Sequence, residues 1–207
     1  MHDHVGASLD NLGVEVIDLV LYHCDDPVRP VTELADTLVS LVEAGHVRRV
    51  GVSNWRAEHL TSLAHELAER GHALVGSYQF SLAERVQALL QGSLHATVLG
   101  VVHEHRLLRL GWSSQARGFF VRAGTEQVNG QPDPYDTEDN RARRRRCREL
   151  SGQLGTRPET VVLAWTLHHP GIWPSISPRT TEQIDRSLEA RRLALTGAQV
   201  RWLQHGG

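Results

Sequence analysis

Residues 14–55 read VEVIDLVLYHCDDPVRPVTELADTLVSLVEAGHVRRVGVSNW, and this stretch predicts a strand, a helix and a second strand. Val14–Tyr22 is rich in β-branched residues and predicts the first strand. Thr32–Ala44 carries leucines at helical spacing, which predicts a helix that ends at Gly45. Val47–Val52 is apolar again and predicts the second strand. Because the helix separates the two strands, we expect them to be parallel and joined by a right-handed crossover.

The same alternation extends in both directions along the chain. Gly6–Leu12 is typical of the end of a helix. Further helices are predicted at Ala57–Arg70, Gln91–Glu104, Asn140–Leu154, Glu159–His168, Thr181–Arg191 and Gly197–Gln204, and further strands at Ala73–Gln79, Leu107–Trp112 and Trp173–Ile176. Each strand and helix pair has the length of a TIM-barrel repeat, but a TIM barrel has eight of them.

We therefore predict an α/β fold, an incomplete TIM (β/α) barrel of about five parallel strands with flanking helices and the first three βα units missing. Residues 1–207 are expected to form a single truncated domain. Residues 122–138 hold Gly130, Pro132 and Pro134, and they predict a mobile loop.

The composition excludes several function classes. The 22 basic side chains face 24 acidic ones, for a net charge of −2, and all the basic ones are arginine. The absence of lysine excludes Schiff-base and P-loop chemistry. A balanced charge predicts no nucleic-acid partner, and no apolar run is long enough for a membrane span. With Cys24 and Cys147 as the only cysteines and no signal-peptide pattern, we expect a cytoplasmic protein.

Two compositional features allow a functional and a structural interpretation. The 13 histidines suggest metal binding, but the pairs His103/His105 and His168/His169 lack metal-site spacing, so no metal site is predicted. The arginines between Arg141 and Arg148 suggest nucleic-acid binding, but flanking acids and the lack of interleaved aromatic residues favour a solvated helix face.

Four segments in order carry a resemblance to a known family. They are Ser8–Asp26 (SLDNLGVEVIDLVLYHCDD), Glu43–Trp55 (EAGHVRRVGVSNW), Gln79–Arg85 (QFSLAER) with Leu110–Phe119 (LGWSSQARGF), and Pro158–Ala190. Together they resemble strands four to eight of the aldo-keto reductases, which are TIM-barrel enzymes. The resemblance implies NADPH-dependent reduction of an aldehyde or ketone, with a small carbonyl compound as substrate.

The resemblance also implies a catalytic aspartate, tyrosine, lysine and histidine. Only the histidine position lies in the matching part, at His23. The sequence has no lysine, and Tyr22, Tyr78 and Tyr135 do not match the tyrosine of the family. We therefore expect that this chain alone does not complete the catalytic set.

The cofactor-binding pattern of the family is better represented. By resemblance, Ser53, Asn54 and Gln79 bind the nicotinamide carboxamide, and Trp112 stacks on the nicotinamide ring. Ser113 and Gly118 line the pyrophosphate. Arg179 matches the residue that binds the 2′-phosphate, and Gln183 and Ser187 match adenine contacts, although serine replaces the common asparagine at position 187.

Two functions remain open at this point. The first is an aldo-keto-reductase-like oxidoreductase. The alternative is a non-catalytic NADP-binding or assembly module that acts through a partner chain. Because an open piece of barrel leaves a strand edge unpaired, either function is compatible with a homo-oligomer or a complementing chain.

Overall fold

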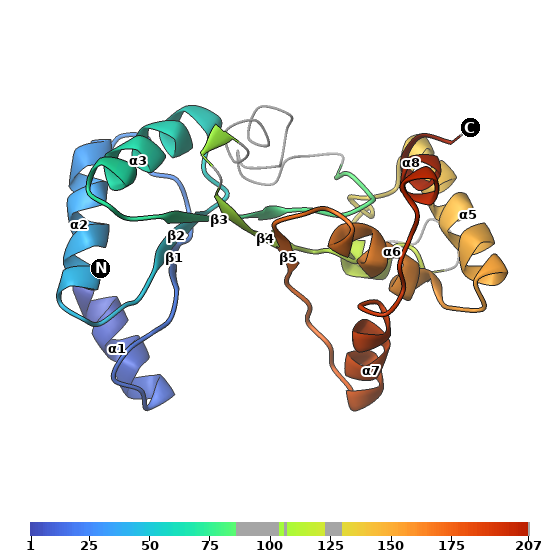
Figure 1. The fold of residues 1–207 in the computed structure, drawn as a ribbon, viewed down its shortest axis with the longest axis horizontal. Coiled ribbons are helices and arrows are strands. Elements are labelled where there is room, and N and C mark those ends of the chain that lie inside the picture. The colour runs from blue at the N-terminus through green and yellow to red at the C-terminus, as the bar shows by residue number, and fades with distance from the viewer. Residues whose placement is uncertain (86–103, 106, 123–129, 207) are drawn as a thin grey trace. The chain divides into compact units, whose positions relative to one another are not determined.

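The computed structural model describes residues 1–85, 104–105, 107–122 and 130–206. These residues form five strands and seven α-helices, and the strands follow one another in the sheet as they do in the chain, in the order β1-β2-β3-β4-β5 (Figure 1). Sequential order without a reversal is typical of barrel sheets, whereas doubly wound sheets change direction once. The predicted α/β fold with five parallel strands is confirmed.

The chain divides into two compact units, each of which is described by itself. Unit 1 contains the described residues of Met1–Tyr78 and Leu89–Arg109, and unit 2 contains those of Gln79–Ala88 and Leu110–Gly207. Each unit has its own cluster of buried apolar side chains.

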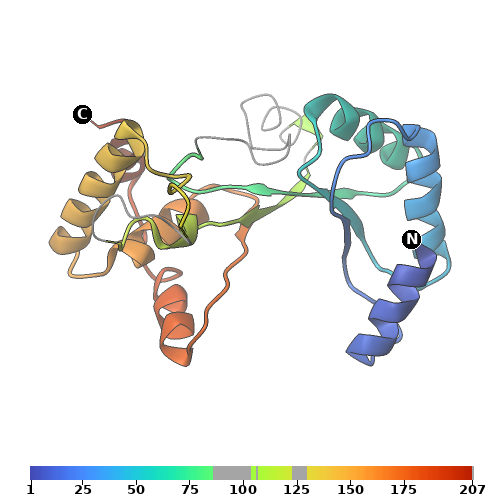
Figure 2. The ribbon, with the colours of Figure 1, turned by 180° about the vertical axis from the view of Figure 1, so that it is seen from behind.

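Unit 1 is a parallel βαβαβ arrangement. Its elements are α1 (His2–Leu12), β1 (Val20–Tyr22), α2 (Val31–Glu43), β2 (Val50–Ser53), α3 (Ala57–Glu69) and β3 (Leu74–Gln79, whose last residue belongs to unit 2). β2 pairs in parallel with β1 and with β3. Figures 1 and 2 show α2 and α3 side by side along these strands, where their leucines pack against Val50, Val52 and Leu74.

The first strand is shorter than the sequence predicts. The prediction began at Val14, but β1 covers only Val20–Tyr22, and a single parallel bridge between Ile17 and Val47 precedes it. β1 lies at the end of the sheet order and, among the described strands, pairs with β2 alone. β propensity alone therefore overestimated its length.

Unit 2 packs its helices around α6. Its elements are β4 (Leu108–Trp112, which begins in unit 1), the short 3₁₀ helix η1 (Ala116–Gly118), α5 (Glu138–Gln153), α6 (Pro158–Leu167), β5 (Ile172–Pro174), α7 (Thr181–Glu189) and α8 (Gly197–His205). α6 contacts α5, α7 and β5, and α5 contacts α8. Trp165 of α6 is 3% exposed and stacks on Phe80, with ring centroids 5.3 Å apart.

The starts of these helices carry capping residues. Thr137, Thr180 and Thr196 each accept a hydrogen bond from a backbone N–H of the helix that follows, as N-caps do. Thr196 and Gln199 complete a capping box. Pro158 is the first residue of α6, where its missing N–H costs nothing.

The interpretation of the arginine run as a solvated helix face is wrong for three of its six members, Arg143, Arg144 and Arg146, whereas Arg141, Arg145 and Arg148 are exposed. Arg144 is 9% exposed and its guanidinium lies 4.8 Å from the centre of the Phe119 ring. Arg143 and Arg146 donate to the backbone carbonyls of Leu203 and Gln204 at the end of α8. These side chains hold α8 against α5, and only a tertiary structure could reveal that.

Two predictions lie partly outside the described residues. Of the helix expected at Gln91–Glu104, only Glu104 is described. Of the loop expected at 122–138, residues 123–129 are not described. Among the described helices, none has the length and apolar character that a membrane crossing requires.

Gly51 allows β2 to lie between its two neighbours. A Cβ added at Gly51 would lie 2.5 Å from the Val75 carbonyl oxygen and 2.6 Å from a Leu21 methyl carbon. We expect Gly51→Ala to lower the free energy of unfolding by about 1 to 3 kcal/mol, because the strands must separate to admit the methyl group. Urea denaturation followed by circular dichroism measures this change.

Gly6→Ala in α1 is the matched control. No atom lies within 4 Å of a Cβ at that position, so this variant should be unchanged or more stable by up to about 1 kcal/mol. Equal stability of the two variants would contradict the assigned packing of β2.

Candidate functional site

A cavity of about 1090 Å³ lies within unit 2, beyond the carboxyl end of β4. It is lined by the turn after β4, Arg148 of α5, the start of α6, the segment after β5, and α7. In parallel α/β sheets, the loops that follow the strands form the binding sites. This cavity is therefore the first candidate for a functional site in unit 2.

Side-chain and backbone hydrogen bonds fix the two strand ends that border the cavity. The Ser114 hydroxyl donates to the carbonyl oxygens of Gly111, at 2.8 Å, and of Ser175, at 3.3 Å. The Ser175 N–H donates to the same Gly111 oxygen at 2.8 Å. The segments after β4 and β5 are thus tied together at their base.

The turn after β4 has an unusual backbone. Ser113, Ala116 and Arg117 have φ values of 54°, 47° and 50°, and Gly118 follows at 81°. Across the described residues, the only other non-glycine residue with positive φ is Asn54, directly after β2. Left-handed conformations cost energy in residues with a Cβ and concentrate at functional sites.

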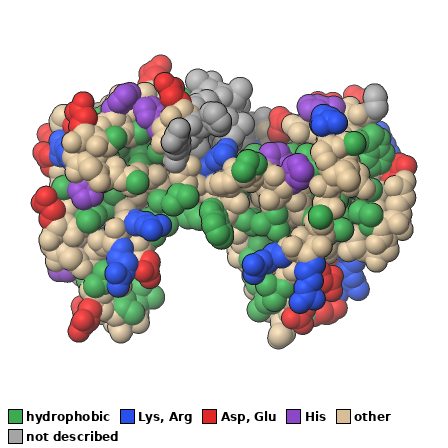
Figure 3. Space-filling view, viewed as in Figure 1, with side chains coloured by type: hydrophobic (Ala, Val, Ile, Leu, Met, Phe, Trp, Pro, Cys, Tyr) green, Lys and Arg blue, Asp and Glu red, His purple; other side chains and the backbone are tan. Residues whose placement is uncertain are grey.

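The lining of the cavity is strongly cationic. It contains five arginines, Arg117, Arg148, Arg157, Arg179 and Arg186, and one acid, Glu159. Arg186 bridges Glu159, at 3.5 Å, and Glu182. Within the described part of the chain, Arg117, Arg157 and Arg179 form no ion pair. The chain as a whole has a net charge of −2, so the excess of positive charge is local to the lining of the cavity. Figure 3 shows arginine and acidic side chains mixed over α7.

The cavity brings together six of the nine residues predicted to bind a cofactor. These are Trp112, Ser113, Gly118, Arg179, Gln183 and Ser187. Arg148, Arg157 and Arg186 also line it, and the sequence analysis did not predict them. Arginine is well suited to bind phosphate. However, the sequence of α5 and of the start of α6 contains no motif that marks these arginines as part of a site.

Two of the six residues already make local hydrogen bonds. The Oε1 of Gln183 accepts from the Arg179 N–H at 2.6 Å, which leaves its amide nitrogen as the group to offer a ligand. The Ser187 hydroxyl donates to the Gln183 carbonyl oxygen at 2.8 Å, and the residue is 7% exposed. Ser187 therefore has less to offer a ligand than the sequence predicts.

Gln79 is the last residue of β3 and is 7% exposed. Its Nε2 donates to the Ala83 carbonyl oxygen at 3.3 Å. It belongs to unit 2 but does not line the cavity.

The remaining predicted residues belong to unit 1. Ser53 ends β2 and is 6% exposed, while Asn54 is 8% exposed and donates its N–H to the Ser77 carbonyl oxygen at 3.0 Å. His23 follows β1 and is exposed. All three lie at strand ends, as the resemblance implies.

The loop that carries His23 is fastened to α3 by a carboxylate that the sequence analysis missed. Asp25 Oδ1 lies 2.6 Å from His59 Nδ1, and its Oδ2 accepts from the Arg56 N–H at 3.2 Å. The Asp25 side chain is only 5% exposed. It thereby satisfies an N–H at the start of α3, a helix without a side-chain cap of its own.

Two of the three tyrosines are shielded from solvent. Tyr78 and Tyr135 are fully buried, and burial is the main cause that raises the pKa of both phenols. Among the described residues, no group of three or more His, Cys, Asp or Glu is placed to hold a metal ion.

The left-handed backbone at Arg117 can be tested directly. Arg117→Gly and Arg117→Ala both remove the guanidinium, but only glycine adopts a φ of 50° without strain. We expect the glycine variant to be more stable than the alanine variant by about 1 kcal/mol, as thermal denaturation would measure. Equal stability would show that the turn is not strained.

Comparison with known proteins agrees with the resemblance. The Aldo/keto reductase family model matches residues 1–205. The chain is 25% identical to the versiconal hemiacetal acetate reductase of Aspergillus parasiticus, over 97% of this chain and 60% of the relative. It is also 25% identical to the 6-dehydroglucose reductase of Agrobacterium fabrum, over 92% and 57%. The chain thus spans about three fifths of the length of these curated relatives.

A solved structure gives the same result for the fold. The aldo-keto reductase of Klebsiella pneumoniae in complex with NADPH matches with a TM-score of 0.74 at 22% identity, over 98% of this chain and 63% of that one. Because the family model covers nearly every residue, the chain belongs to the aldo/keto reductase family.

Proposed function

We propose that this chain binds NADPH through the cavity of unit 2 and forms part of a reductase of aldehydes or ketones. One observation carries the proposal: six residues predicted for the cofactor, from three separate segments, line a single cavity, and Arg179 among them is one of the five arginines of that lining. A dinucleotide with an additional phosphate is a polyanion, so this lining suits it. The NADPH-bound relative from Klebsiella pneumoniae supports the choice of cofactor.

The fit of the residues to such a ligand follows from their chemistry. The exposed guanidinium of Arg179 offers a planar pair of donors for a phosphate monoester. The half-buried indole of Trp112, at the end of β4, offers a flat apolar surface for a ring. When bound, the cofactor supplies the hydride, while these side chains hold and orient it.

For unit 1, the proposal assigns ligand contacts to Ser53, Asn54 and His23 from the resemblance. Their hydroxyl, amide and imidazole groups suit an amide and a carbonyl oxygen as ligands. We propose that residues 1–207 act as one domain, since the family model matches residues 1–205. A cytoplasmic location remains part of the proposal.

Reduction of a carbonyl also needs a proton donor, which we propose this chain does not supply by itself. The sequence has no lysine, and Tyr78 and Tyr135 are buried with raised pKa values. We propose that a complementing chain of different sequence provides the rest of the site. The exposed Trp173 on β5, 64% accessible, offers such a partner an apolar contact.

The second candidate is a non-catalytic module that binds NADP and acts through a partner. The lack of lysine and the burial of Tyr78 and Tyr135 favour it. The two functions differ in turnover after assembly, because only the reductase oxidises NADPH when the partner is present.

We expect NADPH to bind about tenfold or more tightly than NADH. Arg179→Ala should remove most of that preference, because the variant loses a charged hydrogen bond to the 2′-phosphate. Isothermal titration at fixed salt measures the four affinities. Arg145→Ala, an exposed α5 arginine that does not line the cavity, is the matched control and should leave the ratio unchanged.

Trp112 gives an independent readout of the same binding. If the cofactor stacks on it, NADPH quenches tryptophan fluorescence, and Trp112→Phe removes most of the quench. A full quench in this variant would refute the assignment of Trp112. Equal affinity for NADPH and NADH would refute the assignment of Arg179.

We expect the isolated chain to bind NADPH but not to oxidise it in the presence of a panel of aldehydes and quinones. The absorbance of NADPH should therefore stay constant over time. Light scattering on the same sample gives the oligomeric state. Turnover by a monomer would contradict the proposed need for a partner.

A further inference from the structure

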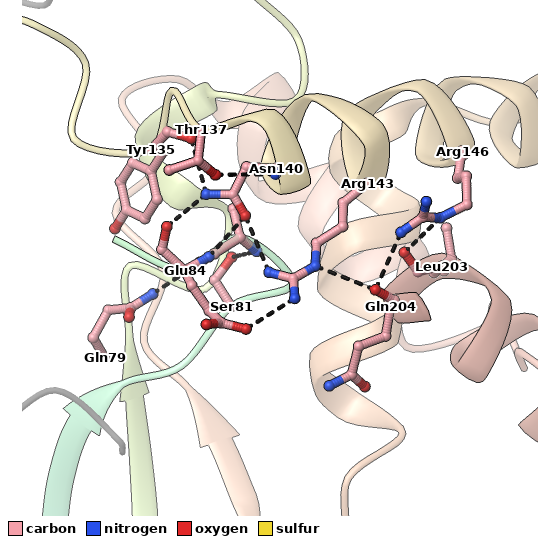
Figure 4. Close-up of polar contacts among 11 residues, drawn as sticks. Gln79, Ser81, Glu84, Tyr135, Thr137, Asn140, Arg143, Arg146, Leu203 and Gln204 are labelled. Carbon is pink, nitrogen blue, oxygen red and sulfur yellow. Dashed lines mark hydrogen bonds and ion pairs between the residues drawn. The ribbon is translucent and has the colours of Figure 1, made fainter. Parts of the chain in front are cut away.

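Asn140, near the start of α5, is fully buried and uses its whole hydrogen-bonding capacity (Figure 4). Its Oδ1 accepts from the Glu84 N–H and from Arg143 Nη1, both at 3.1 Å. Its Nδ2 donates to the carbonyl oxygens of Glu84, at 2.5 Å, and Tyr135, at 2.9 Å. An amide side chain has two acceptor and two donor sites, so none is left unused.

These bonds hold the segment that follows β3. Asn140 binds both the N–H and the carbonyl oxygen of Glu84, which fixes the plane and position of the backbone at that residue. One residue earlier, the Ala83 carbonyl oxygen accepts from Gln79 Nε2 at 3.3 Å, and the Ala83 N–H donates to the Ser81 hydroxyl at 3.4 Å. The chain of contacts from Asn140 thus ends at the side chain of Gln79.

The contact with Ala83 determines which way the Gln79 amide faces. Because Nε2 is directed to a carbonyl oxygen, Oε1 is the end of the amide available to a donor. If the Ala83 oxygen moved, the amide could rotate by half a turn and present Nε2 instead. Figure 4 shows Gln79 with its nitrogen toward this segment and Asn140 on the far side of it.

We propose that Asn140 is a positioning residue for Gln79. By clamping Glu84 it holds the Ala83 carbonyl oxygen, and this keeps Gln79 Oε1 ready to accept a hydrogen bond from a carboxamide. The inference rests on the proposed function for the identity of that ligand, but the clamp itself acts without any ligand.

Arg143 provides a matched control in the same network. It donates to Asn140 Oδ1, pairs with the Glu84 carboxylate at 2.9 Å and reaches the Gln204 carbonyl oxygen at 3.3 Å. Removing it weakens the attachment of α8 and the Glu84 side chain, yet leaves both Asn140 bonds to the Glu84 backbone. Arg143→Ala should therefore lower stability without freeing Gln79.

The first experiment needs only the full chain without ligand. NMR hydrogen exchange of the side-chain amides, with the Gln79 signal assigned from Gln79→Ala, compares Gln79 with the exposed Gln153. We expect Gln79 to exchange about tenfold or more slowly in the wild type. Asn140→Ala should remove the difference and Arg143→Ala should keep it. Equal exchange in the wild type overturns the proposal even if Asn140→Ala does not fold.

The second experiment separates the two halves of the cofactor. NADPH carries the carboxamide, whereas adenosine 2′,5′-bisphosphate lacks it. We expect Asn140→Ala to weaken NADPH binding about fivefold to tenfold and to leave the bisphosphate within about twofold, a loss of the size of one hydrogen bond. If Asn140→Ala weakened the binding of both ligands equally, Asn140 would have a structural role only, and the proposal would be overturned.

A double-mutant cycle tests the link itself. Gln79→Ala should weaken NADPH binding in the wild type but have little further effect in the Asn140→Ala background. Additive effects would overturn the proposal. If the wild type binds neither nucleotide, the proposed function fails, and the ligand-free exchange data still decide whether Asn140 positions Gln79.

Discussion

The turn after β4 is the constraint on which the candidate site depends. The Gly111 carbonyl oxygen accepts from both the Ser114 hydroxyl and the Ser175 N–H, so the segments after β4 and β5 start from one fixed point. From there, left-handed residues between Ser113 and Gly118 fold the chain back to line the cavity. Their strain is tolerated because hydrogen bonds and burial of Phe119 and Phe120 hold both ends of the turn.

Arginine does two kinds of work in this lysine-free chain. On α5, Arg143, Arg144 and Arg146 contact backbone carbonyls or an aromatic ring, and they fasten helices to one another. Around the cavity, Arg157 and Arg179 are exposed and form no ion pair within the described residues, so their charge is available to a ligand. The planar guanidinium suits both roles, because it donates several hydrogen bonds in fixed directions and keeps its charge when partly buried.

The two units place strand-end residues by different means. In unit 1, Asp25 joins the loop after β1 to the start of α3 through His59 and the Arg56 N–H. In unit 2, Asn140 joins the segment after β3 to α5. In both cases a buried polar side chain satisfies backbone groups that the regular elements leave unpaired, and such groups are costly when they have no partner.

The sequence by itself determined the order and type of the described helices and strands, because strand and helix periodicity and the stop at Gly45 act within a few neighbouring residues. The family resemblance also identified Trp112, Ser113, Gly118 and Arg179, which do line one cavity. Only the tertiary structure revealed the roles of Arg148, Arg157, Asp25 and Asn140. Their contacts join distant segments, as when Asn140 binds a residue 56 positions away, and no local pattern encodes such pairings. The sequence also overestimated β1, whose length depends on the neighbouring strand rather than on its own apolar residues.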